Sequence, residues 1–262
     1  ETSGGHVISI CVLHFNRDDL TAPCVESVLR QDLSNIDHEI VVVDNGSDPR
    51  FVAPGAWAER VRVHRLPQNV GHIEGQNECL RVAQSPWVLF LSNDVRLSGQ
   101  WDFRYLTGFL LHQAKQRTAQ AMPLLRTPKG TIDTLGLHYR WPGYGLSITQ
   151  RDEYHEWYCV PSIAYFLQQS VWAELGGFDA SLPGAYEDVD FGIRLHHLDY
   201  RCTTMSSFEA VHLGNATLQY TKKDRWRFQR ARKQVIQKHY QRVEQWARLT
   251  AVTALDLTRG AF

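Results

Sequence analysis

Short apolar runs and helix-patterned segments alternate along the first third of the chain. Residues 7–14 and 39–43 are almost entirely apolar and rich in β-branched side chains, which is typical of strands buried on both faces of a parallel sheet. Residues 18–33, between them, repeat apolar side chains at helical spacing. A strand, a helix and a strand within about 30 residues predict a βαβ unit with a right-handed crossover.

A similar pattern continues along much of the chain. Further strands are expected at 61–66, 87–91 and 163–168, and further helices at 74–84, 101–117, 170–175 and 187–198. Residues 122–160 differ, because they are rich in Gly, Pro and aromatic residues and have no clear period. After residue 221 the polar pattern predicts one long helix. We therefore expect an α/β domain over residues 1–220, with a mostly parallel sheet flanked by helices, and a C-terminal helical extension over residues 221–262.

Composition narrows the class of protein without indicating a partner. The 28 basic and 28 acidic residues balance, so the global charge does not favour a polyanionic partner. The hydrophobic share of 43% supports a packed core. Five cysteines, with neither a CxxC pair nor zinc-ligand spacing, are typical of reduced thiols in the cytosol. No apolar run approaches the ~20 residues needed to span a bilayer, so we expect a cytoplasmic location.

Acidic residues stand where several predicted elements begin or end. Asp44 directly follows residues 39–43, Asp94 follows residues 87–91 closely, and Asp188 lies at the start of a later helix. Ligands bind beyond the carboxyl ends of the strands in doubly wound α/β sheets, so Asp44 and Asp94 are expected to face one crevice. Taken alone, either residue is explained equally well by a turn, since Asp, Asn and Gly favour turns.

Two helix starts carry further candidate chemistry. Residues 68–77 open a helix after a strand, and Gly71 there lets the backbone approach a ligand near a helix N-terminus, which favours phosphate. Alone, that segment is better explained as a tight turn. Three carboxylates within four positions begin the later helix, and the helix dipole explains part of this. Glu187 and Asp190 are three residues apart, whereas Asp188 points elsewhere and is free to face a cleft.

Seven segments along the chain together resemble the family-2 glycosyltransferases, a group of inverting enzymes with the GT-A fold. The segments are ISICVLHFNR, IVVVDNGSDP, QNVGHIEGQN, VLFLSNDV, ELGGFD, YEDVDFGIRL and VHLGN. They cover about residues 7–215, in the family's order and at plausible spacing. One such match arises easily by chance, but seven in order do not. Within the family, the chain most resembles bacterial rhamnosyltransferase-like enzymes of cell-surface polysaccharide synthesis.

The resemblance implies a Rossmann-like GT-A domain with a nucleotide-sugar half over about 7–100 and an acceptor half over about 101–220. The residues implied to contact the donor are His14, Phe15, Asn16 and Arg17 beside the nucleobase, Asp44 on the base or ribose, and Asn69 and Gly71 in the nucleotide pocket. Ser92, Asn93 and Asp94 occupy the family's DxD position, where Asp94 matches the metal-binding aspartate. Ser92 replaces the family's first aspartate, so the ribose or metal contact there departs from the pattern.

The resemblance also implies the remaining site residues. Asp188 matches the family's catalytic base, and Glu187 beside it is expected to line the substrate site and, with Asp190, to orient the loop and helix. His212, in VHLGN, matches a late histidine that often completes the metal site. Trp141 lies in the aromatic segment 139–158, where the family places acceptor contacts and where a sugar could stack; packing of a surface loop explains these aromatics equally well.

These residue types suit metal-assisted sugar transfer. A divalent metal stabilises the negative charge of a departing nucleoside diphosphate, and carboxylate and imidazole ligands favour Mn²⁺ or Mg²⁺. A carboxylate base takes the proton of the acceptor hydroxyl as the bond forms, and a single displacement inverts the anomeric carbon. The expected donor is dTDP-rhamnose, a UDP-sugar or a GDP-sugar, and the expected acceptor is a glycan or lipid-linked glycan.

The basic segment 222–238 leaves the location of the protein open between two interpretations. It holds eight basic residues and one acidic residue, with aromatic side chains among them. Such a helix can lie on the anionic inner face of a cell membrane as a peripheral contact; the alternative is a solvated helix packed through its apolar stripe. No motif that reads nucleic acid accompanies the charge, so a nucleic-acid partner is not expected.

Two other functions compete with the transferase. A sugar-1-phosphate nucleotidyltransferase also uses an α/β nucleotide fold, but it needs a Gly-rich N-terminal loop with a basic residue for the triphosphate, and HFNRDDL offers none. A non-catalytic carbohydrate-binding relative predicts loss of Asp94 or Asp188, and both are present. These residues therefore favour the enzyme.

Overall fold

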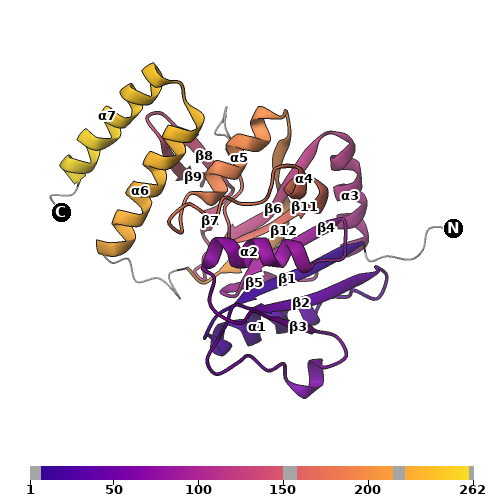
Figure 1. Ribbon diagram of the computed structural model, residues 1–262. Coiled ribbons are helices and arrows are strands. Elements are labelled where there is room, and N and C mark those ends of the chain that lie inside the picture. Colours follow the sequence, from indigo (N-terminus) through magenta and orange to yellow (C-terminus); the bar gives the residue numbers. More distant parts are fainter. Residues whose placement is uncertain (1–6, 150–157, 215–221, 260–262) are drawn as a thin grey trace.

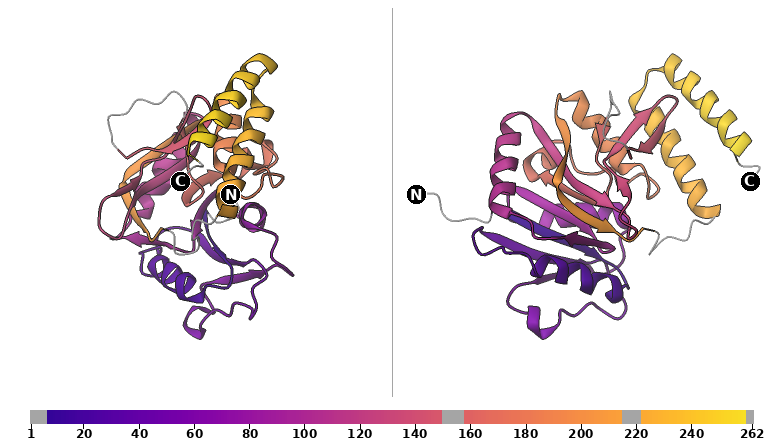
Figure 2. Two further views of the ribbon diagram at one scale, coloured as in Figure 1. Left: turned by 90° about the vertical axis from the view of Figure 1, so that its left-hand side faces the viewer. Right: turned by 180° about the vertical axis from the view of Figure 1, so that it is seen from behind.

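A computed structural model describes residues 7–149, 158–214 and 222–259 (Figure 1). One large twisted sheet forms the centre of the molecule, and helices cover both of its faces. A smaller sheet and two C-terminal helices lie at one end (Figure 2). The expected α/β architecture is confirmed.

The central sheet begins with four parallel strands in the order β3-β2-β1-β4. Their bounds are β1 Ile8–His14, β2 His38–Asp44, β3 Arg62–Arg65 and β4 Trp87–Ser92. Nearly every residue of β1 and β4 is buried, which explains why these segments are continuous apolar runs rather than alternating ones. The register pairs His14 with Asp44 and Leu13 with Ser92, so the carboxyl ends of three strands meet at one edge.

The second half of the sheet mixes strand directions. The path continues β4-β11-β6-β12-β5, with β7 beside β6; the bounds are β5 Val95–Ser98, β6 Thr118–Arg126, β7 Ile132–Thr134, β11 Ala164–Gln168 and β12 Arg201–His212. Because β11 is antiparallel to both neighbours, β6 and β12 regain the direction of β4, while β5 and β7 oppose it. Among the described strands of this sheet, six of nine therefore share one direction, as expected for a mostly parallel sheet.

Helices on the two faces hold the sheet in place. Their bounds are α1 Asp18–Leu29, α2 His72–Val82, α3 Phe103–Lys115, α4 Gln169–Glu174 and α5 Glu187–His197, with a short 3-10 turn at Gly55–Trp57. Helix α1 follows β1 and α2 follows β3, and the two lie on opposite faces of the sheet (Figures 1 and 2). The core between these layers contains fully buried aromatic rings, among them Phe90 stacked on Tyr165 with centroids 4.9 Å apart.

The aperiodic segment forms more regular structure than its sequence predicts. It contributes β6, β7 and a small antiparallel sheet of β8 Leu137–Arg140, β9 Tyr144–Ser147 and β10 Tyr158–Cys159. Residues 150–157, which complete the aromatic segment, lie outside the described residues.

The prediction of one long C-terminal helix is wrong. The chain forms α6 Lys222–His239 and α7 Arg242–Arg259, which fold back on each other. Arg232 of α6 pairs with Asp256 of α7, and the guanidinium of Arg248 lies 3.9 Å from the ring centroid of Tyr240 at the turn. These two contacts hold the pair together. No helix in the described part of the chain is long and apolar enough to cross a membrane.

Candidate active site

An acidic residue and a histidine meet beyond the end of β4. Asp94 lies in the turn between β4 and β5, and the pairing of β5 with β12 places His212 beside it. The His212 Nε2 atom lies 3.4 Å from Asp94 Oδ2, while Nδ1 lies 2.7 Å from Oδ2 of Asp133. Asp133 thus fixes the imidazole with Nε2 directed at Asp94, the arrangement in which a carboxylate orients a metal-binding histidine.

Two carboxylates, Asp94 and Asp133, face the imidazole of His212 and attract positive charge, whether a proton on Nε2 or a metal ion that would replace it. Burial alone would raise the pKa of Asp94, but His212 and Ser92 lower it, so the carboxylate is ionised. Burial would lower the pKa of His212, but its contacts with Asp133 and Asp94 raise it to about 9. The buried Asp94 Oδ1 atom has no hydrogen-bond partner among the described residues. Within those residues, no three His, Cys, Asp or Glu side chains are grouped to hold a metal by themselves.

A second carboxylate lies at the start of α5. Tyr186, just before the helix, adopts the left-handed conformation with φ of 66°, which is uncommon for a bulky residue and is found where the surrounding structure enforces it. Asp188 accepts hydrogen bonds from the backbone N–H of Val189 at 2.8 Å and of Ser162 at 3.3 Å. Burial, together with the charge of Glu187, raises the pKa of Asp188 to about 7.

Residues from α2 and β11 complete the surroundings of this carboxylate. Glu187 is buried, which raises its pKa, and it accepts a hydrogen bond from Gln76 at 3.3 Å. Gln76 in turn accepts one from the Tyr165 hydroxyl at 3.0 Å. His72, the first residue of α2, lies 3.9 Å from Glu187, and the charges of Asp188 and Asp94 both act on its imidazole. His72 therefore lies near both the Asp94–His212 pair and Asp188.

Asp44 and Asn16 organise the loops after β1 and β2. Asp44 is buried and accepts hydrogen bonds from the N–H groups of Ser47 at 2.9 Å and Phe51 at 3.1 Å, and from Arg65. Burial opposes its ionisation, but these hydrogen bonds lower the pKa of Asp44. Asn16, in the left-handed region with φ of 52°, donates its backbone N–H to the Ser47 hydroxyl at 3.0 Å. The loops after β1 and β2 are thus bonded together.

The loop after β3 is packed against the same structure. Gly46 has φ of +72°, and a Cβ atom there would lie 2.2 Å from the backbone carbonyl carbon of Gln68. Asn69 accepts a hydrogen bond from the N–H of Gly71 at 2.8 Å. Gly71 precedes α2 as its N-cap and provides no side-chain cap, so the first N–H groups of that helix can face an anion.

The remaining predicted residues differ in how they are placed. His14 is fully buried, with Nδ1 2.7 Å from the Thr21 hydroxyl, so it supports α1 rather than facing solvent. Asn93 is also buried and donates to the same hydroxyl at 3.3 Å. Phe15 is 39% exposed beside the loops described above. Arg17 forms an ion pair with Asp19.

Trp141 lies apart from these loops. It is 61% exposed and lies in the turn between β8 and β9. Its neighbours in the aromatic segment are packed rather than open, because Tyr139 stacks on Tyr240 and the Arg232 guanidinium lies 4.2 Å from the ring centroid of Tyr144. Among the described aromatics of this segment, Trp141 is therefore the one that offers a broad free face.

The sequence did not identify four residues of the site: His72, Gln76, Asp133 and Ser162. His72 and Gln76 lie within a segment recognised as a helix start. They lie close to Glu187 only because α5, more than 100 positions later in the chain, packs beside α2. Asp133 belongs to the aperiodic segment, and Ser162 lies between that segment and β11, where no pattern marks it. Each reaches the site only through the fold of the second half of the sheet.

Comparison with known proteins identifies relatives of this chain. The profile of the family described as Glycosyl transferase family 2 matches residues 9–175. An uncharacterized glycosyltransferase of Haemophilus influenzae is 33% identical over 88 residues, 34% of this chain and 29% of that protein. The O-antigen biosynthesis protein RfbC of Myxococcus xanthus is 24% identical over 228 residues, 80% of this chain and 17% of that protein. The chain thus spans less than a third of either curated relative.

Solved structures share the fold at low sequence identity. The mannosyltransferase PcManGT of Pyrobaculum calidifontis, in complex with GDP-Man and Mn²⁺, has a TM-score of 0.60 at 16% identity, over 90% of this chain and 64% of that one. GalNAc-T7 with UDP, GalNAc and Mn²⁺ has a TM-score of 0.59 at 14% identity, over 80% of this chain and 44% of that one. Both comparisons support the GT-A architecture.

Proposed function

Because this chain belongs to glycosyl transferase family 2, we propose that it transfers a sugar from a nucleoside-diphosphate sugar to a glycan hydroxyl with inversion of the anomeric carbon. The observation that carries the proposal is that the charges of two acidic groups, from different parts of the chain, both act on the His72 imidazole. One is Asp94, which pairs with His212, and the other is Asp188, a carboxylate with a raised pKa. A metal-assisted displacement with one base requires both groups.

The first group would hold Mn²⁺ or Mg²⁺. Asp94 offers an oxygen without a described partner, and Asp133 directs His212 Nε2 to the same place. When bound, the metal would neutralise the charge that develops on the departing diphosphate. Two protein ligands leave room for diphosphate oxygens and water, which both ions accept. The Mn²⁺ in the PcManGT and GalNAc-T7 structures supports this choice.

Asp188 would act as the base. Its ionised form takes the proton of the acceptor hydroxyl, whose oxygen attacks the anomeric carbon while the nucleoside diphosphate leaves. A pKa of about 7 suits this task, because general bases work best when their pKa lies near the working pH. The hydrogen bond from Gln76 to Glu187 helps to hold the start of α5 in place. A single displacement of this kind inverts the anomeric centre.

The nucleotide would lie over the joined loops after β1, β2 and β3. Asp44 and Asn16 hold those loops, Phe15 offers an exposed ring to the base, and Asn69 and Gly71 present the uncapped start of α2 to the diphosphate. Candidate donors are dTDP-rhamnose, UDP-sugars and GDP-sugars. The similarity to an O-antigen biosynthesis protein favours an acceptor in cell-surface polysaccharide synthesis and, with it, dTDP-rhamnose.

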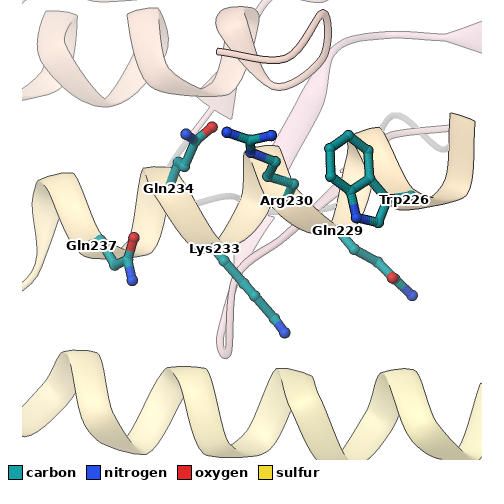
Figure 3. A pocket seen from close by; sticks show the side chains of 6 residues that line it. All are labelled: Trp226, Gln229, Arg230, Lys233, Gln234 and Gln237. Atoms are coloured by element: carbon teal, nitrogen blue, oxygen red, sulfur yellow. The ribbon is translucent and has the colours of Figure 1, made fainter. Parts of the chain in front are cut away.

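The acceptor would be met at an anionic membrane surface through α6. Trp226 is 53% exposed, and the Arg230 guanidinium lies 5.1 Å from its ring centroid. These two residues border a polar groove of about 390 Å³ whose other lining residues, Gln229, Lys233, Gln234 and Gln237, also belong to α6 (Figure 3). Aromatic and basic side chains on one helix suit the headgroup region of a membrane.

Liposome binding tests the membrane part of the proposal. Replacing Arg225, Arg227 and Arg230 by Glu is expected to release the protein from vesicles that contain anionic lipid, without changing turnover on a soluble acceptor. Lys129, a basic residue in the turn between β6 and β7, provides a matched charge-reversal control. If the wild-type protein fails to bind such vesicles at low salt, the proposed membrane contact is wrong, and the proposed transferase activity is unaffected.

Donor screening tests the transferase itself. The purified protein is incubated with UDP-, GDP- and dTDP-sugars and a glycan acceptor, and the released nucleotide is identified. Release of nucleoside diphosphate that stops on addition of EDTA supports the proposal. Release of pyrophosphate from a nucleoside triphosphate and a sugar phosphate would instead identify a nucleotidyltransferase, and donor or glycan binding without turnover would identify a binding protein.

A further inference from the structure

A buried carboxylate on α5 is held by residues at the end of α6. Asp190 has no exposed surface. Its Oδ1 atom lies 2.7 Å from His239 Nε2 and 2.8 Å from Lys238 Nζ, both at the end of α6. Its Oδ2 atom accepts a hydrogen bond from Arg194 Nε at 2.9 Å. Burial opposes ionisation, but these partners lower the pKa of Asp190, so the interaction is one of charges.

The same end of α6 also holds the loop before α5. Lys238 Nζ lies 2.7 Å from Asp179 Oδ2, and this contact helps to lower the pKa of Asp179 to about 2 against the effect of burial. Phe178, the preceding residue, donates its backbone N–H to Asn77 of α2 at 2.8 Å. One lysine therefore links α6 both to α5 and to a loop that is fixed on the nucleotide-sugar half.

Helix α6 meets α5 a second time at the start of the helix. The ring of Phe228 lies edge-on to Tyr186, with centroids 6.3 Å apart. The charge of Arg232, a buried residue of α6, also acts on Tyr186. Tyr186 is the left-handed residue that immediately precedes Glu187 and Asp188. Helix α6 thus contacts Tyr186, which precedes Asp188 in sequence, and Asp190, which follows it.

Helical geometry places the side chains of Asp190 and Asp188 on different sides of α5. Two residues along an α-helix differ by about 200° in direction, because each residue turns by about 100°. Asp190 therefore points to α6, while Asp188 points to the opposite side, where it meets Ser162. A helix held from behind in this way presents its front side chain in one orientation.

Buried ion pairs of this kind are poor sources of stability, because desolvation offsets much of their attraction. Their better-attested role is to specify one arrangement among several. We propose that α6 is a positioning element of the active site, in which His239 and Lys238 act through Asp190 to hold the base Asp188 against the crevice. This inference rests on the proposed function, since it assigns a purpose to contacts with the helix that carries the base.

Substitutions at His239 test the inference. His239→Leu removes the hydrogen bond to Asp190, whereas His239→Gln keeps a side-chain N–H donor near the same position. We expect His239→Leu to lower kcat by about 10–100-fold, the range that a displaced catalytic group produces, and His239→Gln to restore kcat to within about 3-fold of wild type. The dissociation constant of the donor, measured by calorimetry, should stay within about 2-fold in both, because His239 acts on α5 and not on the loops proposed to bind the nucleotide.

Controls separate this outcome from general damage and from failure of the proposed function. Glu244→Gln, which neutralises an exposed carboxylate that pairs with Arg248 within α7, should leave kcat unchanged. Asp188→Asn should lower kcat by about 10²–10⁴-fold. If it does so while His239→Leu retains wild-type kcat, the positioning role is overturned and the transferase stands; if Asp188→Asn stays active, the proposed base is wrong instead. Should His239→Leu not fold, Lys238→Met decides: a kcat lowered about 3–10-fold supports the role, and an unchanged kcat overturns it.

Discussion

Replacing Asp188 by Asn is expected to stabilise the protein while it removes catalysis. The carboxylate of Asp188 is enclosed by Ser162 and by Glu187, whose charge repels it. An ordinary aspartate has a pKa of 3.8, and here the value rises to about 7. Asparagine keeps the shape and a hydrogen-bonding oxygen, but it carries no charge. The substitution therefore isolates the free energy of holding a charge at this place.

The magnitude follows from the difference between the two pKa values. Because the folded pKa is raised, the folded protein keeps a proton that the unfolded chain releases between about pH 4 and 7, so the free energy of unfolding falls as pH rises through that window. At ~1.4 kcal/mol for each pH unit, the full difference is about 4 kcal/mol. Asp188 keeps some exposure to solvent, and screening reduces this to roughly 2 kcal/mol.

Two measurements check the prediction. At pH 8 the melting temperature of Asp188→Asn should exceed that of the wild type by about 4–8 °C, and the difference should disappear near pH 4. The kcat should fall by about 10²–10⁴-fold, the usual loss for a general base. In the wild type, kcat should fall about tenfold for each pH unit below 7, with half of the limiting rate near pH 7. A variant that is less stable than wild type at pH 8 would refute the electrostatic reasoning.

Three other substitutions examine separate parts of the structure. Asp133→Asn should raise the Mn²⁺ concentration for half-maximal activity by about 10-fold, and His212→Ala by more, because the imidazole loses its orientation or is absent; an unchanged metal titration would contradict the assigned ligands. Gly46→Ala should lower the free energy of unfolding by about 3 kcal/mol, seen in urea denaturation, because the added Cβ meets backbone at a positive φ. Trp141→Ala should raise the acceptor KM by about 10-fold and leave the donor KM alone; equal kinetics would remove the stacking role.

Much of the first half of the fold could be predicted from sequence because its information is local. Strands β1, β2 and β4 are buried on both faces, so their apolar runs stand out, and the helices between them fix the direction of the chain. The acidic residues after these strands follow from the same logic. The side-chain partners at these strand ends could not be predicted in the same way. His14 contacts Thr21 and Asp44 pairs with Arg65, and no periodic pattern in the sequence reveals such contacts.

The second half was harder to predict because its strands do not carry a clear pattern. Strand β12 has only scattered buried positions along its twelve residues. Strand β6 is buried throughout, yet it contains Pro123 and the polar Gln120, which accepts a hydrogen bond from Cys202. Both are defined by pairing with each other, 80 or more positions apart. Asp133, on β7 beside β6, and Ser162, just before β11, reach the site through this half of the sheet, so their roles could not be predicted before the fold was known.

The contact between Gly46 and the backbone of Gln68 bears on how the nucleotide preference that we propose for these loops could change. Two loops that touch backbone to backbone cannot lengthen or shorten independently, since an insertion in either one would push the other away. Asn16 extends the same restriction to the loop after β1 through its bonds to Ser47 and Asp48. New nucleotide preferences should therefore arise in evolution, or in the laboratory, by exchanging side chains such as Phe15 on a frame of fixed loop lengths.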